Sequence, residues 1–181
     1  MSSSNSERFE GGGDTVDKHV EHPKLEKLKR LLKAYIWKFE NHRDQFINEF
    51  SLLISDWKEQ LPNLHHIFTK QEMDWILMRS IKSCYLYEEI VEFVIRSGYK
   101  DEPDLDEDGK PLLRRTTAVH QIAECHRNGS KIELLIKLFE IYDKFHVNYT
   151  DELGYTHFHM ACLYGLDDVA QKFLELGQDP N

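Results

Sequence analysis

The segment from Asn148 to Asn181 restricts the possible folds of this chain more than any other part of the sequence. A polar turn up to Tyr155 precedes a short apolar stretch that runs into Gly165, and a second apolar stretch ends at Gly177. Glycine closes helices and permits tight turns because it adopts positive φ without strain. The order therefore predicts a turn followed by two short helices. A helix pair of this size cannot bury both apolar faces by itself, so we expect it to stack on neighbouring pairs.

An earlier segment follows the same order. Thr117 precedes His120 by three residues, and Thr156 precedes His159 in the same way. Each threonine stands before an apolar stretch, where its hydroxyl is suited to cap a helix. Internal similarity at a period of about 20 to 50 residues is the signature of repeat architectures. The two segments therefore predict successive units of a helical repeat.

The best-preserved unit resembles the ankyrin repeat, whose signature T-P-L-H-x-A lies within about 33 residues. Residues 148–159 match the connector pattern N-x-x-D-x-x-G-x-T-x-x-H of that family, and residues 172–181 match its helix-to-loop ending. The chain is similar to arthropod ankyrin-repeat proteins with a helical N-terminal region. The resemblance implies an all-α ankyrin-repeat solenoid over 69–181, with a degenerate repeat over 69–98 and repeats over 109–147 and 148–181. Because a stack needs a polar face at each end, we expect the array to continue beyond the last residue.

The resemblance also implies roles for individual residues. Motif residues would cap helices, bond to the adjacent repeat, keep helices close or form turns: Thr117, His120, Ala123, Gly154, Thr156, His159, Ala161 and Gly165. In this family partner proteins lie on the concave surface formed by connectors and first helices. At the corresponding positions the predicted partner-binding residues are Arg115, Gln121, Glu152, Tyr155, His157 and Phe158.

The rest of the chain also indicates an all-α protein, because no segment alternates apolar and polar residues. Residues 1–22 are rich in serine, glycine and charge, which predicts a disordered tail. Residues 23–68 predict an N-terminal helical region with one helix from Pro23 and a second that ends at Leu61, before Pro62. An exposed acidic loop is predicted over 101–108.

Further helix boundaries follow from capping signals. Thr69 and Glu72 have the spacing of a capping box, which predicts a helix start. Gly98 predicts the end of the helix that follows this one. Apolar spacing predicts further helices over about 117–127 and about 130–145.

No cofactor is predicted. The candidate zinc ligands lack the short paired spacing of zinc sites, so we assign them structural roles: His120, Cys125, His126, His157, His159 and Cys162. The stretch from Asp104 imitates a calcium loop, but its twelfth residue is Arg115, where a bidentate glutamate is required. Arg114 and Arg115 before Thr117 resemble a kinase site, although the capping role of Thr117 is favoured. No phosphate loop or nucleophile–base pair is recognisable, so we expect no enzyme.

Charge and targeting signals limit the cellular role. The net charge of -9 disfavours nucleic acid as a partner. No apolar run approaches the ~18 residues of a membrane span, and the N-terminus lacks a secretion signal. The three scattered cysteines fit a reducing compartment. We therefore expect an intracellular, cytoplasmic protein without membrane insertion, a nuclear location being compatible as well.

The leading hypothesis is a non-enzymatic scaffold for a partner protein on the concave ankyrin surface. One alternative is a substrate-recruiting adaptor of a ubiquitin-ligase-type complex. Another is a nucleic-acid or anionic-membrane binder that uses the basic residues of helix 24–38. The partner's identity and the oligomeric state stay open at this point.

Overall fold

The computed structural model describes residues 22–35, 39–58, 60–82, 87–124 and 131–179. The regular structure within these ranges is helical, and β-type pairing there is limited to isolated bridges. The helices are α1 (Pro23–Ala34), α2 (Glu40–Ile54), α3 (Lys70–Lys82), α4 (Tyr87–Arg96), α5 (Ala118–Gln121), α6 (Lys131–Ile141), α7 (His157–Leu163) and α8 (Asp167–Glu175), with 3-10 turns η1 (Leu64–His66) and η2 (Ile122–Glu124). The all-α prediction is confirmed for the described residues. The predicted tail, apart from His22, lies outside them.

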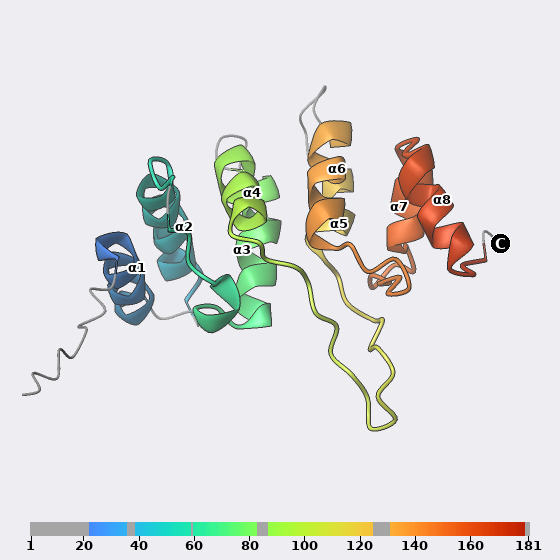
Figure 1. Cartoon of the computed structure of the whole chain (residues 1–181), viewed down its shortest axis with the longest axis horizontal. Helices are drawn as coiled ribbons and strands as arrows, with labels where there is room; N and C mark the ends of the chain where they lie inside the picture. Colours follow the sequence, from blue (N-terminus) through green and yellow to red (C-terminus); the bar gives the residue numbers. More distant parts are fainter. Residues whose placement is uncertain (1–21, 36–38, 59, 83–86, 125–130, 180–181) are drawn as a thin grey trace, which may run out of the picture.

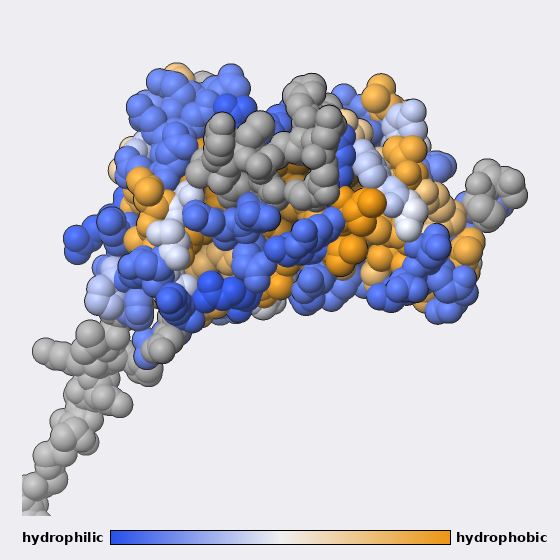
Figure 2. Space-filling model, turned by 90° about the horizontal axis from the view of Figure 1, so that it is seen from above, coloured by the Kyte–Doolittle hydropathy of each residue, from blue (hydrophilic) through white to orange (hydrophobic). Residues whose placement is uncertain are grey.

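The helices stand as four pairs, side by side in one row (Figure 1). α1 lies beside α2, α3 beside α4, α5 beside α6 and α7 beside α8. Between α4 and α5 the chain leaves the row as an extended excursion, which appears in yellow in Figure 1. From above, hydrophilic residues and exposed apolar residues alternate along the surface of the row (Figure 2).

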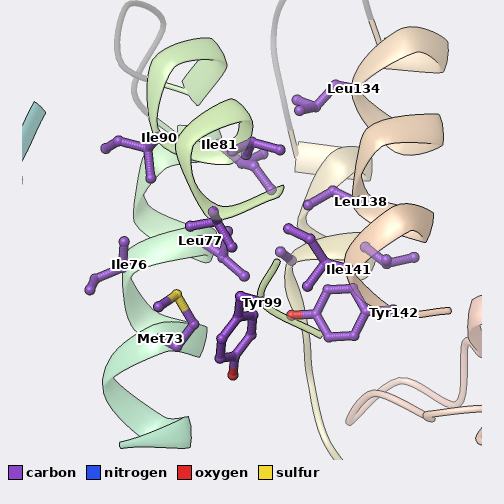
Figure 3. Close-up of a cluster of buried hydrophobic side chains, with 14 of the residues drawn as sticks. Met73, Ile76, Leu77, Ile81, Ile90, Tyr99, Leu134, Leu138, Ile141 and Tyr142 are labelled. Atoms are coloured by element: carbon purple, nitrogen blue, oxygen red, sulfur yellow. The ribbon is translucent and has the colours of Figure 1, made fainter. Parts of the chain in front are cut away.

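One apolar core runs along the row from Leu28 in α1 to Phe173 in α8. Figure 3 shows its central part, where side chains of α3 and α4 face those of α6. The core also crosses the boundary predicted near residue 68. The ring of Phe50 in α2 meets those of Phe68 and Phe93 edge to face, at centroid distances of 5.7 and 5.8 Å. The N-terminal helices therefore share one apolar core with the helices that follow.

Two of the predicted helix boundaries are confirmed. The Thr69 N–H donates to Glu72 Oε2 (2.8 Å) while the Glu72 N–H donates to Thr69 Oγ1 (3.2 Å), which is the reciprocal capping box. At the end of α4, Gly98 has a φ of 73° and its N–H donates to the Ile95 carbonyl. Glycine is favoured there because L-residues with side chains rarely adopt positive φ.

Three predicted helices are longer than the observed ones. α2 ends at Ile54 rather than Leu61, because Trp57 turns back into the core and its carbonyl accepts a hydrogen bond from Arg96 (3.0 Å). α6 ends at Ile141 rather than near residue 145. Its last two carbonyls, of Glu140 and Ile141, accept hydrogen bonds from Lys100 Nζ and from the Asp101 N–H. The helix predicted over 117–127 is a single α-turn, α5, followed by η2; residues 125–130 lie outside the described ranges.

Candidate protein-binding groove

Two similar caps begin α5 and α7. The Thr117 N–H donates to His120 Nδ1 (3.1 Å), and the Thr156 N–H donates to His159 Nδ1 (3.0 Å). The Thr156 hydroxyl also accepts from the His159 N–H (3.1 Å). Both threonines have an extended backbone, so each stands just outside its helix. At Thr117 the His120 N–H donates to the threonine carbonyl (3.1 Å). The capping role predicted for the Thr–His pairs agrees with this geometry.

The two units are joined by a hydrogen bond through Thr117. Its Oγ1 lies 2.6 Å from Nε2 of His157, and the rings of His120 and His157 are 4.9 Å apart. The resemblance implied that the motif histidines, His120 and His159, bond near their caps and across to the adjacent repeat. His120 bonds to its own cap, but His157 makes the bond between the two units, and Nε2 of His120 has no hydrogen-bond partner among the described residues.

Both histidines are buried, and their pKa values reflect this. Burial lowers the pKa of His157 well below its ordinary value, and the neighbouring His120 and Arg115 act in the same direction. Burial also lowers the pKa of His120, against an opposing effect of Asp151. Both imidazoles are therefore neutral at pH 7.

Arg115 lies inside a polar network rather than on a binding surface. Its guanidinium donates to both carboxylate oxygens of Asp74 (2.8 and 2.5 Å), to Asp101 (2.9 Å) and to the Tyr149 hydroxyl (3.0 Å). The Tyr149 hydroxyl in turn donates to Asp101 (2.7 Å). Only 15% of the Arg115 side chain is exposed. The predicted partner contact of Arg115 is therefore corrected to a structural role, in which it fastens the segment after α4 to α3.

The acidic loop predicted over 101–108 is exposed only in part. Asp101 is 5% exposed and belongs to the Arg115 network. Asp104 pairs with Lys70 and Glu102 with Lys144, although both carboxylates are largely exposed. Burial raises the pKa of Tyr149 and Tyr99, and the Asp101 carboxylate adds to this effect. The start of the loop is therefore buried and holds the excursion in place, whereas the sequence predicted that the whole loop would be exposed to solvent.

Three more predicted roles change. His157 and Phe158 are 1% and 4% exposed, so neither presents a side chain to a partner. The Phe158 ring packs on Phe173 at 5.7 Å. Ala161 is fully buried as expected, whereas Ala123 is exposed. Ala123 follows Thr117 by six residues and Ala161 follows Thr156 by five, so Ile122 occupies the buried position in the earlier unit.

The other predicted partner-binding residues meet in one groove. It has a volume of about 660 Å³ and lies between the α5–η2 turn, the connector over 151–155 and α7. The residues that line it are Thr116, His120, Gln121, Ala123, Asp151, Glu152, Leu153, Tyr155, Met160 and Leu163. Of these, Gln121, Glu152 and Tyr155 are among the residues predicted from the sequence.

The connector that forms one wall is held by its own hydrogen bonds. Asp151 Oδ1 accepts from the N–H groups of Leu153 (2.9 Å) and Tyr155 (2.8 Å), and Gly154 has a φ of 89°. At its base, the main chain of Thr150 exchanges hydrogen bonds with Leu113 and Arg115 (2.8 and 2.9 Å). The wall is therefore a fixed turn, as Gly154 predicted.

Two apolar side chains of the groove were missed in the sequence. Leu153 is 83% exposed in the connector, and Leu163 is 67% exposed at the end of α7. Leu153 had a recognisable signal, since it is an apolar residue within an otherwise polar turn. Leu163 had none, because it continues the apolar pattern of its helix and only the arrangement of neighbours leaves it uncovered.

Groups of three or more histidine, cysteine, aspartate or glutamate side chains placed to bind a metal do not occur in the described ranges. Within the same residues, each helix is too short or too polar to cross a membrane. Comparison of the chain with protein-family models, with curated proteins and with solved structures finds no match.

Proposed function

We propose that this chain is a non-enzymatic protein-interaction module, and that its partner binds in the groove between α5–η2, the connector and α7. The supporting observation is the cluster of exposed apolar side chains there: Leu153, Tyr155 (53% exposed) and Leu163. Apolar surface that is exposed together and bordered by polar residues is typical of protein-binding sites, in which tyrosine is enriched.

We further propose that residues 69–181 form an ankyrin-repeat array, with repeats over 109–147 and 148–181 and a degenerate repeat over 69–98. Three features support this proposal: the matching Thr–His caps of α5 and α7, the row of helix pairs, and the positive φ of Gly154 and Gly165 (89° and 65°). In such an array the groove lies where connectors and first helices face the partner.

Affinity capture with matched variants tests the binding proposal. Leu153→Ser and Leu163→Gln remove apolar surface from the groove, whereas Leu52→Gln, a residue 76% exposed on α2, removes it elsewhere. Quantitative mass spectrometry of captured proteins is expected to show a set that both groove variants lose and Leu52→Gln keeps. Equal capture by all three variants would contradict a role of the groove.

A second candidate function rests on α1. Lys27, Arg30 and Lys33 are exposed on this helix, whereas Lys24 pairs with Asp56. An exposed cationic helix at the end of the row is suited to an anionic polymer or membrane surface. Replacing the three residues by glutamine is expected to abolish retention on heparin or on phosphatidylserine vesicles. Unchanged retention of the triple variant would rule this function out.

A further inference from the structure

The charged side chains that line the groove are acidic. Two carboxylates, Asp151 and Glu152, belong to its lining, and lysine or arginine does not. Arg115 is turned inward and held by Asp74 and Asp101. The exposed Arg114 lies outside the groove lining, in a second hollow that it shares with the other side of the connector. His120 is neutral at pH 7 because burial lowers its pKa. The field in the groove therefore favours a cationic ligand group.

The groove also offers a hydrogen-bond acceptor that is unpaired among the described residues and that a cationic donor group would satisfy. Glu152 is exposed and makes no hydrogen bond or ion pair with the described residues. A ligand that brings several N–H donors with a positive charge would pair with this carboxylate.

The apolar part of the lining further restricts which cationic group fits the groove. The half-exposed ring of Tyr155 belongs to the same lining as Glu152, and Ala123 and Leu163 add exposed aliphatic surface. A guanidinium is planar, stacks on aromatic rings and carries five donors, whereas an ammonium is a compact and strongly hydrated charge. A tyrosine ring and a carboxylate together suit arginine better than lysine.

We propose that the groove recognises an arginine side chain of a partner protein, presented by an extended segment with apolar residues on either side. The guanidinium binds between Glu152 and the Tyr155 ring and donates to the Glu152 carboxylate, while the flanking apolar side chains cover Leu153 and Leu163. This inference rests on the proposed protein-binding function and adds the chemistry of the partner to it.

A display library of random linear peptides tests the proposal on the full chain. Peptides sorted on the wild-type protein are expected to be enriched in arginine beside apolar residues. Glu152→Lys should abolish this enrichment, because a like charge replaces the carboxylate. Glu107→Lys is the matched control, since Glu107 is an exposed glutamate that lies outside the groove lining.

Fluorescence polarisation of one enriched peptide then measures each contribution. Arginine-to-glutamine replacement in the peptide, or Glu152→Lys in the protein, should weaken binding by roughly tenfold or more. Arginine-to-lysine replacement should weaken it roughly two- to fivefold, which corresponds to the loss of stacking on the ring. All variants change exposed side chains, and circular dichroism confirms that each is folded before binding is measured.

The possible failures are distinct. Enriched peptides without arginine, whose binding is lost in Leu163→Gln but kept in Glu152→Lys, would overturn the arginine proposal and leave the protein-binding function in place. Enrichment that neither Leu153→Ser nor Leu163→Gln changes, or the absence of any enrichment, would count against both proposals.

Discussion

The caps of α5 and α7 have the same local structure and opposite surroundings. The Thr117 N–H donates to His120 Nδ1 as the Thr156 N–H donates to His159 Nδ1, with donor–acceptor distances that agree within 0.1 Å. Yet Thr117 and His120 are 0% and 5% exposed, because α7 lies against them with His157, whereas His159 is exposed. The short motif is enough to form a cap. Burial of the cap comes from the next helix pair.

The residues that precede the two caps differ most. Two positions before Thr117 stands Arg115, buried among carboxylates, and two positions before Thr156 stands Gly154 in an exposed turn. The connector before α5 is therefore held by the ion pairs of Arg115, and the connector before α7 by the backbone conformation at Gly154. The following four predictions test this difference, from the largest expected effect to the smallest.

Arg115→Met should have the largest effect. It leaves Asp74 and Asp101 without their counter-charge, and breaking a buried ion pair lowers the free energy of unfolding by about 3–5 kcal/mol. Gly154→Ala, at the equivalent position, should lower it by about 1 kcal/mol, since the strain is at one positive φ. Urea denaturation measures both. Equal losses would mean that the Arg115 network is not what holds the earlier connector.

The caps themselves give the second test. Thr117→Val removes the cap and leaves His157 Nε2 buried without its partner, so we expect a loss of about 2–4 kcal/mol. Thr156→Val removes only an accessible cap, worth about 1 kcal/mol. The comparison uses the same substitution in the same motif. Similar losses in the two variants would show that the contact with α7 adds no stability.

The buried histidines make stability depend on pH. The pKa of His157 is lower in the folded protein than its ordinary 6.5, so below about pH 6.5 the unfolded chain binds more protons. The free energy of unfolding should therefore be highest above this pH and fall as the pH is lowered, by at most about 1.4 kcal/mol per pH unit for each such histidine. Urea titrations between pH 7.5 and 5.5 measure the slope. His157→Gln should reduce it, and an unchanged slope would place its origin elsewhere.

The smallest effect on stability is expected at Leu153. This side chain is 83% exposed on a connector held by Asp151, so Leu153→Ser should change the free energy of unfolding by less than about 0.5 kcal/mol. The same variant should lose partner binding in the capture experiment. A large loss of stability would show that Leu153 has a structural function and is not a ligand-facing residue.

Features that depend on near neighbours in the chain were predicted correctly. The Thr69–Glu72 capping box, the helix end at Gly98 and the two Thr–His caps each involve residues within a few positions of one another. Helix ends set by distant groups were predicted less well. Trp57 and the Lys100 contact with the end of α6 illustrate this, since both stop helices through residues about forty positions away.

The candidate site was predicted in part for the same reason. Gln121, Glu152 and Tyr155 line the groove as the motif positions suggested. Arg115 and His157, at comparable positions, turn inward, because Asp74 and Thr117 provide partners that only the folded chain brings near. Leu163 is a groove residue solely because nothing among the described residues covers it.

The amino-acid sequence by itself determined the all-helical class and the local caps and turns, because those depend on apolar periodicity and on hydrogen bonds between close positions in the chain. The tertiary structure alone decided which of two similar caps is buried, which charged residues form the internal network and which apolar residues line the groove. Those outcomes depend on the distances between residues far apart in the sequence, and on the loss of water where helix pairs meet.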